Sequence, residues 1–422
     1  MTDYFDALDT EAPDAKETRL LSSLAGFLSA AIGDCPGVAK QLEGVDVTSV
    51  NTRADLQSLP VLRKTELMQS QSAKPPFGGF VKESALSGTR VFMSPGPVWE
   101  PQVSGGDPWQ GARALHAAGI RHGDRVHNAF SYHLTPGGFI LDESARALGC
   151  TVFPAGVGNT EAQVEAMHHF SPSAFMGTPD YLKILLEAAQ DRGKPITCLK
   201  RAMVSGGALF PTLREYYENL GIVTRQCYAT ADLGIVSYET DVNGECVPGM
   251  VVNEGLIVEI VRPGTGEPVS AGDVGEILVT RLHEDYPLIR FATGDMSRFL
   301  SEPSPCGRTA PRIAGWMGRA DQRTKVKGMF VDPGQLDAIF SLNADIRRVR
   351  LNVSRQGDAD HAQLLVQLGD DHAVNGNGGD TLQQDITGAF QASTGLSAEV
   401  AFVSEALPND GVLIHDVRDY DA

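Results

Sequence analysis

The strongest constraint on this chain is a regular alternation of strand-like and helix-like patterns between residues 107 and 239. Short apolar or β-branched runs, typical of buried strands, lie at 125–130, 151–153, 174–176, 201–204 and 224–227. Helical patterns lie around and between these runs, at 108–119, 138–149, 160–170, 179–192 and 210–220. Such alternation predicts βαβ units, and therefore a mostly parallel sheet flanked by helices.

The pattern changes twice after residue 239. Residues 255–261 and 275–280 enclose a turn rich in Pro and Gly, which predicts a small antiparallel β region. After residue 318 the pattern becomes a short α+β sequence of elements. We therefore predict an α/β fold with two domains, 1–317 with mostly parallel sheets and 318–422 with a small α+β fold.

Charge and composition exclude several classes of partner. The chain has 35 Lys and Arg against 53 Asp and Glu, a formal net charge of −18. A surface this acidic repels nucleic acid and anionic membranes, so a nucleotide site must be locally positive or built from backbone N–H groups. Residues 1–15 show no signal-peptide pattern, and no apolar run is long enough to cross a bilayer. The six cysteines include no C-x-x-C pair and do not form the pattern of a disulfide framework. Together these features lead us to expect a cytoplasmic protein.

Two loops that follow predicted strands carry candidate binding residues. The first is Ser205, Gly206, Gly207 and Ala208, where glycines allow a flat ring or a phosphate to approach the backbone. The alternative is an ordinary strand-to-helix turn, which also needs small residues. The second is Tyr228–Asp232, in which Thr230 is suited to a phosphate oxygen and Asp232 to Mg²⁺. A helix N-cap is the alternative role for Thr230.

Two further motifs lie near the predicted domain boundary. Asp295 follows a glycine, and a carboxylate placed in this way can accept both hydroxyls of a ribose. A plain surface turn is the alternative. Residues 318–328 are cationic in a chain that is otherwise acidic, and include Arg319. A cationic cluster at a domain boundary is suited to phosphates, whereas the alternative is a solvated basic hairpin.

Taken together, the order and spacing of these motifs resemble the adenylate-forming acyl-CoA synthetases, in particular their phenylacetate–CoA ligase branch. The resemblance implies ATP or AMP, Mg²⁺ and coenzyme A as cofactors, and an acyl-adenylate intermediate. It places Ser205–Ala208 and Tyr228 at the adenine, Asp295 at the ribose, Arg319 near the ribose or phosphate, and Asp321 at the hinge of the C-terminal domain. It also implies an acid-binding pocket around Phe130, Tyr132, His133 and Gly137, for which plain core packing is the alternative.

The chain departs from this family where lysines are expected. In the phosphate-loop segment 90–101, Pro97 removes a backbone N–H and Glu100 replaces a lysine. We expect the carboxylate of Glu100 to repel phosphate. Near the C-terminus, Val412 stands where the family has the lysine that clamps the adenylation transition state. Loss of one such electrostatic donor costs about 3–4 kcal/mol of transition-state stabilisation, so adenylation is expected to be weak.

Two interpretations of function follow. The first is an acyl- or aryl-CoA ligase acting on a small carboxylic acid, with CoA or a carrier thiol as acceptor and a homodimer left open. The second is a catalytically impaired AMP- or acyl-binding homologue with a sensing or scaffolding role, which Glu100 and Val412 favour. A nicotinamide oxidoreductase fits poorly, because no strand is followed by G-x-G-x-x-G. No structural zinc is expected, since only Cys246 and Cys306 resemble ligands that bind zinc in some relatives.

Overall fold

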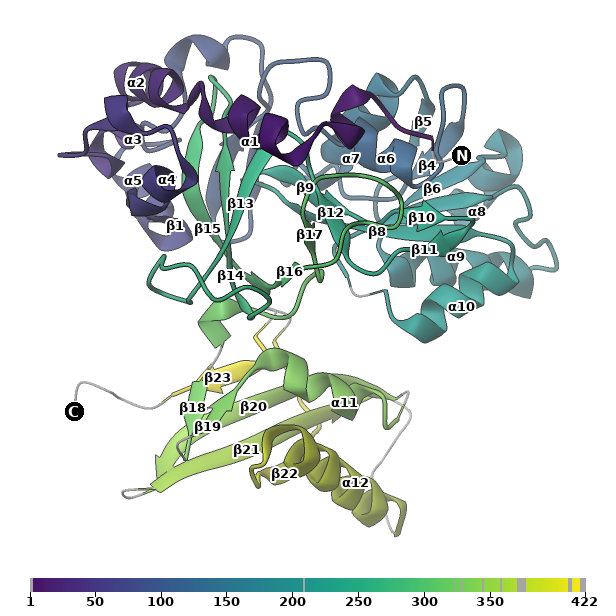
Figure 1. Ribbon diagram of the computed structural model, residues 1–422. Coiled ribbons are helices and arrows are strands. Elements are labelled where there is room, and N and C mark those ends of the chain that lie inside the picture. Colours follow the sequence, from purple (N-terminus) through teal and green to yellow (C-terminus); the bar gives the residue numbers. More distant parts are fainter. Residues whose placement is uncertain are drawn as a thin grey trace. The chain divides into compact units, whose positions relative to one another are not determined.

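The computed structural model describes residues 3–207, 209–322, 324–327, 329–343, 345–356, 359–369, 377–408 and 412–417. The chain divides into two compact units (Figure 1). The first comprises residues 1–293 and 297–315, and the second residues 294–296 and 316–422. This division lies two residues before the predicted boundary at 317/318, and rotation of the second unit about Asp321 stays a prediction.

A nine-stranded sheet forms the centre of the first unit, in the order β16-β17-β12-β9-β8-β7-β6-β4-β5. Its strands are β4 Arg125–Asn128, β5 Thr151–Pro154, β6 Ala174–Gly177, β7 Arg201–Val204, β8 Val223–Thr230, β9 Gly234–Tyr238, β12 Met250–Val252, β16 Phe299–Leu300 and β17 Arg312–Ile313. Strands β5, β4, β6, β7 and β8 are parallel, which confirms the predicted parallel sheet. The remaining strands continue the sheet in antiparallel pairs.

Helices cover both faces of the parallel part of this sheet. They are α6 Ala112–Ala117, α7 Gly137–Ala147, α8 Thr160–Phe170, α9 Pro179–Asp191 and α10 Pro211–Asn219. Successive side chains of a strand point to opposite faces. In β6, Ala174 and Met176 accordingly pack with Leu115 of α6 and Ile140 of α7, whereas Phe175 packs with residues of α8, α9 and α10. The strand is apolar throughout because both of its faces are buried.

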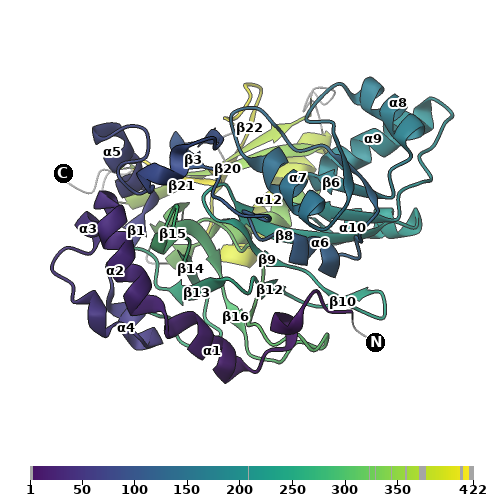
Figure 2. The same ribbon diagram turned by 90° about the horizontal axis from the view of Figure 1, so that it is seen from above.

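A smaller, four-stranded sheet of the first unit has the order β1-β15-β14-β13. Its strands are β1 Leu62–Arg63, β13 Leu256–Val261, β14 Gly275–Arg281 and β15 Leu288–Ser297. Strands β13 and β14 pair antiparallel, as the sequence predicts. The helices beside this sheet (Figure 2) are α1 Pro13–Leu21, α2 Leu24–Asp34, α3 Pro36–Gln41, α4 Arg53–Ser58 and α5 Lys64–Ala73. Apolar residues of α1 and α2, such as Leu20 and Leu28, share one core with Ile257 and Ile277.

Short elements complete the first unit. Two hairpins are formed by β2 Val91–Ser94 with β3 Val98–Pro101 and by β10 Asp241–Val242 with β11 Glu245–Cys246. The 3₁₀-helices are η1 Ala7–Thr10, η2 Val47–Ser49 and η3 Glu83–Leu86. Among the described residues, no helix is both long and apolar enough to cross a membrane.

The second unit has its own α+β core. Its elements are η4 Ala320–Gln322, β18 Thr324–Val326, β19 Met329–Val331, η5 Pro333–Leu336, α11 Asp337–Phe340, β20 Ile346–Gln356, β21 Ala359–Leu368, α12 Asn377–Thr394, β22 Glu399–Val403 and β23 Ile414–Asp416. Four of the strands form a sheet in the order β22-β21-β20-β23. Ile386 and Phe390 of α12 pack on Leu351 and Leu364 of this sheet. The unit therefore buries apolar surface independently of the first.

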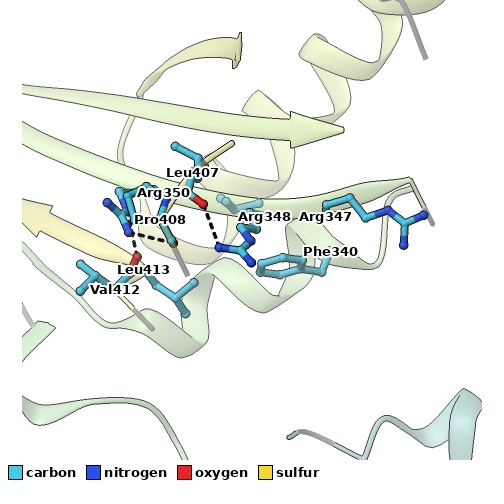
Figure 3. Close-up of a pocket in the computed structure, with 9 residues that line it drawn as sticks. Phe340, Arg347, Arg348, Arg350, Leu407, Pro408, Val412 and Leu413 are labelled. Carbon is cyan, nitrogen blue, oxygen red and sulfur yellow. Dashed lines mark hydrogen bonds between the residues drawn. The ribbon is translucent and has the colours of Figure 1, made fainter. Parts of the chain in front are cut away.

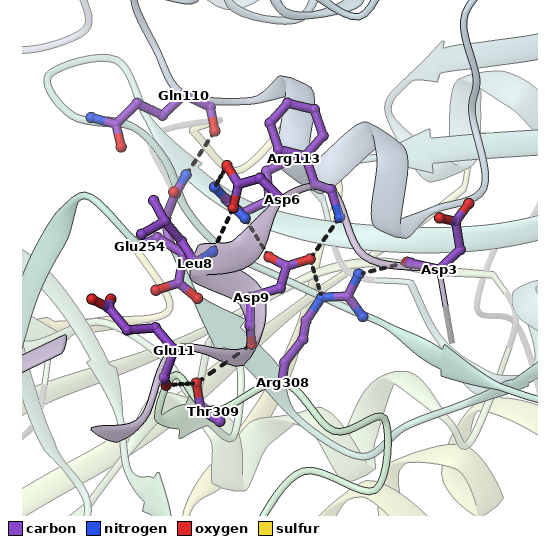
Figure 4. Close-up of polar contacts among 12 residues, drawn as sticks. Asp3, Asp6, Leu8, Asp9, Glu11, Gln110, Arg113, Glu254, Arg308 and Thr309 are labelled. Carbon is purple, nitrogen blue, oxygen red and sulfur yellow. Dashed lines mark hydrogen bonds and ion pairs between the residues drawn. The ribbon is translucent and has the colours of Figure 1, made fainter. Parts of the chain in front are cut away.

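The N-terminal residues 3–11 are held against the first unit by a buried ion-pair cluster (Figure 4). The carboxylate of Asp9 is 0% exposed and pairs with the guanidinium groups of Arg113 and Arg308. It also accepts a hydrogen bond from the backbone N–H of Phe5, and the Asp9 carbonyl accepts from the N–H of Thr309 at 3.0 Å. The cluster compensates charges that would otherwise be costly to bury.

We predict that Asp9→Asn lowers the free energy of unfolding of the first unit by about 3–5 kcal/mol, because it leaves two buried guanidinium groups without their shared carboxylate. Asp6→Asn is the matched control: Asp6 also pairs with Arg113, at 2.7 Å, but its side chain is 40% exposed. It should cost less than about 1 kcal/mol. Urea denaturation followed by fluorescence measures both variants, and equal losses would contradict the role given to Asp9.

Candidate active site

The predicted loops of the first unit meet at one edge of the nine-stranded sheet. Strands β4, β6, β7 and β8 are parallel, so the loops that follow them leave from the same edge. Ser205, the first residue after β7, donates a hydrogen bond from Oγ to the Cys227 carbonyl at 2.8 Å and so ties β7 to β8. In open α/β sheets, ligands bind beyond the carboxyl ends of the strands. This edge is therefore the candidate site.

The glycine loop lies beside an aromatic residue of the predicted acid pocket. Gly206 has a φ of +70°, a conformation that L side chains rarely adopt. A Cβ added there would lie 3.8 Å from both the Phe130 ring and the Thr178 methyl group. The carbonyl of Gly207 accepts from Gln226 Nε2 at 3.0 Å. The structure thus brings Ser205, Gly206 and Gly207 together with Phe130, while Ala208 lies outside the described residues.

Tyr228 and Thr230 belong to the last part of β8, which is longer than the sequence indicates. The Tyr228 side chain is buried in the same hydrophobic core as the smaller sheet of the first unit. The Thr230 hydroxyl accepts a hydrogen bond from the N–H of Leu233 at 3.2 Å, within the turn that leads to β9. A strand and not a helix follows this turn, so the alternative of a helix N-cap at Thr230 is wrong.

The other predicted acid-pocket residues lie in the loop before α7 and at its start. The Tyr132 hydroxyl donates to Asp142 at 2.8 Å and accepts from Asn128 Nδ2 at 2.7 Å. Burial, together with Asp142, raises the pKa of Tyr132 well above its ordinary value. His133 is exposed, which contradicts the alternative of a core histidine. Gly137 is the first residue of α7, and a Cβ added there would lie 3.9 Å from both the Ser131 carbonyl oxygen and Thr135 Oγ1.

Asp295 and Arg319 meet within the second unit. Their backbones form an isolated antiparallel bridge, and Arg319 Nη1 lies 3.5 Å from Asp295 Oδ1. The same oxygen accepts a hydrogen bond from Trp316 Nε1 at 2.9 Å. Gly294 has a φ of +74°, and a Cβ there would lie 2.9 Å from the Arg319 guanidinium. The glycine before Asp295 therefore leaves space for the guanidinium group of Arg319. The side chain of Asp321 is outside the described part of the chain.

A buried pair of carboxyl groups, Glu100 and Asp232, lies at the end of β3 and in the β8–β9 turn. Glu100 is 1% exposed and Asp232 is 2% exposed. Ser94 Oγ donates to Glu100 Oε1 at 2.5 Å, and Lys64 Nζ lies 3.3 Å from Asp232 Oδ2. The Asp232 carbonyl accepts from Arg281 Nη1 at 3.0 Å. This cluster joins the start of α5, the β2–β3 hairpin and two strand ends.

Burial, with the nearby Asp232 as a second cause, raises the pKa of Glu100 to about 9. With both groups ionised, Glu100 Oε2 and Asp232 Oδ1 are buried without a hydrogen-bond donor. A proton on Glu100 turns these two oxygens into a donor and an acceptor. Both features favour a protonated Glu100, and the expectation that its charge repels phosphate stays a prediction.

The geometry of Asp232 does not fit a magnesium ligand. One of its oxygens pairs with Lys64 and the other lies against Glu100, whereas Mg²⁺ needs ionised oxygen ligands open to phosphate or water. Within the described ranges, no three His, Cys, Asp or Glu side chains cluster as metal ligands do. Cys306 Sγ lies 3.1 Å from Ser304 Oγ and 3.6 Å from Arg308 Nη1. The absence of zinc stays a prediction.

Lys64, the cation that pairs with Asp232 in this cluster, was not predicted from the sequence. Lys64 is the first residue of α5. A positive charge in the first turn opposes the helix dipole, so its presence there is a signal that the side chain serves another purpose. Trp316 was missed as well, since a single tryptophan shortly after β17 carries no local pattern. Both residues contact carboxylates named in the motifs, which only the tertiary structure reveals.

Comparison with known proteins gives consistent similarities. The sequence profile of the family described as AMP-binding enzyme matches residues 144–283. Phenylacetate-coenzyme A ligase of Thermus thermophilus is 32% identical over 342 residues, covering 77% of this chain and 75% of the relative. The Escherichia coli protein of the same name is 28% identical over 382 residues, covering 86% and 85%.

Solved structures of acyl-CoA ligases are also similar to this chain. The crystal structure of 2-hydroxyisobutyryl-CoA ligase in the postadenylation state, in complex with R3-HIB-AMP, has a TM-score of 0.80 and 25% identity, covering 97% of this chain and 91% of that one. An open conformation of the same ligase, in complex with 2-HIB-AMP and CoA, has a TM-score of 0.76 and covers 97% and 93%.

We predict that Glu100→Gln flattens the pH dependence of stability. The raised pKa of Glu100 means that the folded protein keeps a proton which the unfolded chain releases above about pH 4.5. The wild type should therefore lose stability as the pH rises from 5 to 9, by up to about 1.4 kcal/mol per pH unit from this group. Glutamine can still accept from Ser94 and donate to Asp232.

Urea denaturation of both proteins at several pH values isolates this contribution, because all other titrating groups are shared. Parallel stability curves for the two proteins would show that Glu100 is already ionised in the folded state.

Proposed function

This chain belongs to the phenylacetate–CoA ligase-like branch of the adenylate-forming enzymes, and on that premise we propose that it joins a carboxylic acid to the thiol of CoA through an acyl-adenylate. In this reaction the acid carboxylate attacks the α-phosphate of ATP and releases pyrophosphate. The CoA thiol then attacks the acyl carbon and releases AMP. A carrier thiol is the alternative acceptor.

The observation that carries the proposal is the juxtaposition of Phe130 with the glycine loop at the carboxyl edge of the sheet. Gly206 presents backbone without a side chain, and its nearest neighbours in that direction, Phe130 and Thr178, are 3.8 Å from where a Cβ would lie. Such a place suits a flat ring against the backbone on one side and an apolar acid on the other. This supports adenine at Ser205–Ala208 and Tyr228, and a flat or aromatic acid near Phe130.

Further roles in nucleotide binding follow from the hydrogen-bonding groups. Asp295 is an acceptor held in place by Trp316 and Arg319, as a carboxylate that binds two ribose hydroxyls needs to be. Thr230 offers a hydroxyl at the end of β8 for a phosphate oxygen. The Lys64 side chain is partly exposed, and its amino group lies 3.3 Å from Asp232 Oδ2. We therefore assign Lys64 to the compensation of phosphate charge.

A second candidate function is an impaired homologue that binds AMP or an acyl group without efficient turnover. Val412 favours it, because valine offers no charge where the family has its C-terminal lysine. Pro97 favours it too, since the phosphate-loop hairpin lacks one N–H. Both candidates keep nucleotide binding, so they differ in turnover and not in affinity for AMP.

We predict that Asp295→Ala weakens AMP binding at least tenfold, because a charged hydrogen bond to the ribose is lost. Isothermal titration calorimetry of AMP against both proteins measures the change. Asp273→Ala, in an exposed loop of the first unit, removes the same charge and should leave the affinity unchanged. Equal affinities for wild type and Asp295→Ala would remove Asp295 from the nucleotide site.

We also predict that the two half-reactions are unequal. The departures at Pro97 and Val412 concern displacement of pyrophosphate, in which negative charge builds up and needs N–H groups or cations. A synthetic acyl-AMP should therefore be converted to acyl-CoA faster than the same acid with ATP. Pyrophosphate exchange and a thioester assay on preformed adenylate measure the two steps.

Turnover from free acid at about 1–10³ s⁻¹, the usual range for enzymes, would show that other groups, such as Lys64, replace the missing lysines. Failure of both half-reactions in a protein that still binds AMP would favour the impaired homologue.

A further inference from the structure

A cationic pocket lies in the second unit, although the net charge of the whole chain is −18. We call it the arginine pocket; its volume is about 290 Å³, and it is lined by Arg347, Arg348, Arg350, Phe340, Leu407 and Val412, among others. Figure 3 shows Arg348 beside the Phe340 ring, with Leu407 and Pro408 across from it. The described residues that line the pocket include no carboxylate.

An irregularity in β20 brings neighbouring arginines to the same pocket. Successive strand residues normally point to opposite faces, but the pairing of β20 with β21 shifts register between Ile346 and Arg348. A bulge of this kind re-aims the extra residue, here Arg347. Gly369 gives it room, because a Cβ there would lie 3.1 Å from Arg347 Nε. The local backbone is thus shaped around a guanidinium group.

The three arginines of the pocket differ in burial and in their hydrogen bonds. Arg350 is largely buried and donates from Nε to the Val412 carbonyl at 3.1 Å and from Nη2 to the Pro408 carbonyl at 3.4 Å, so it fixes the pocket wall. Arg348 donates from Nη1 to the Leu407 carbonyl at 2.8 Å, which orients its guanidinium and leaves further N–H groups. Neither Arg347 nor Arg348 has an ion-pair partner in the described part of the chain.

We propose that the arginine pocket binds a phosphate-bearing anion, with Arg348 and Arg347 as its direct ligands. Guanidinium groups match phosphate oxygens in paired hydrogen bonds, and like charges on one strand need an anion to compensate them. If the proposed function holds, two such anions are at hand, the 3′-phosphorylated adenosine end of CoA and pyrophosphate. The apolar Phe340 and Val412 beside the arginines favour the adenosine end, which has a ring as well as phosphates.

Calorimetry on the full chain, with AMP present in excess, tests the proposal with two probes, adenosine 3′,5′-bisphosphate and inorganic pyrophosphate. Arg348→Gln should weaken binding of at least one probe about tenfold or more, and Arg347→Gln should weaken it severalfold. Arg262→Gln is the matched control, because it removes an exposed arginine of the first unit that pairs with Glu267. It should leave both affinities unchanged.

Each outcome decides a separate point. Loss confined to the bisphosphate identifies the adenosine end as the ligand, and loss confined to pyrophosphate identifies the inorganic anion. The proposal is overturned if neither probe binds, or if both arginine variants bind like Arg262→Gln. Arg347 is exposed, so its variant keeps the test informative should Arg348→Gln fail to fold. The readout is binding alone, so a protein without ligase turnover can still support the pocket.

Discussion

The common direction of five neighbouring strands is the constraint on which the rest of the first unit depends. Because β5, β4, β6, β7 and β8 run in parallel, every loop that leaves their carboxyl ends emerges on one edge. Residues as far apart in sequence as Phe130 and Gly206 become neighbours for this reason alone. The β2–β3 hairpin and the start of α5 then reach the same edge through Glu100 and Lys64, which both lie close to Asp232.

The periodicity of the sequence was sufficient to predict the helices and strands, but it said little about which side chains contact one another. The parallel strands and their helices were predicted within a few residues, because strands buried on both faces are continuous apolar runs. The glycine loop and Asp295 were singled out by the order and spacing of the motifs, and their binding roles stay predictions. The burial of Glu100 was not foreseen, since nothing local tells a buried carboxyl group from a solvated one. Lys64 and Trp316 were not predicted as site residues, because the carboxylates that they contact, Asp232 and Asp295, are not adjacent to them in the sequence.

The acidic composition makes the placement of each cation informative. Arg113 and Arg308 are balanced by Asp9, and Arg290 is balanced by Glu259 at 3.0 Å inside the smaller sheet. The carboxyl group of Glu100 is also buried, and there burial raises the pKa, which favours the neutral form. At these places burial is accompanied by pairing or by a raised pKa, whereas Arg347 and Arg348 of the arginine pocket have no ion-pair partner among the described residues.

The ion pairs of Asp9 also determine when the N-terminal segment can complete its contacts during synthesis of the chain. Thr309 and Asp9 are 300 residues apart, yet their contact holds the N-terminal segment in place. A ribosome adds about 5–20 residues each second, so residues 3–11 wait for about 15–60 s before Arg308 and Thr309 emerge. The sheet of β4–β8 is complete well before then. During this interval Asp9 already has Arg113 as a partner but lacks Arg308, so the N-terminal segment is held by only part of its contacts until synthesis of the first unit is nearly complete.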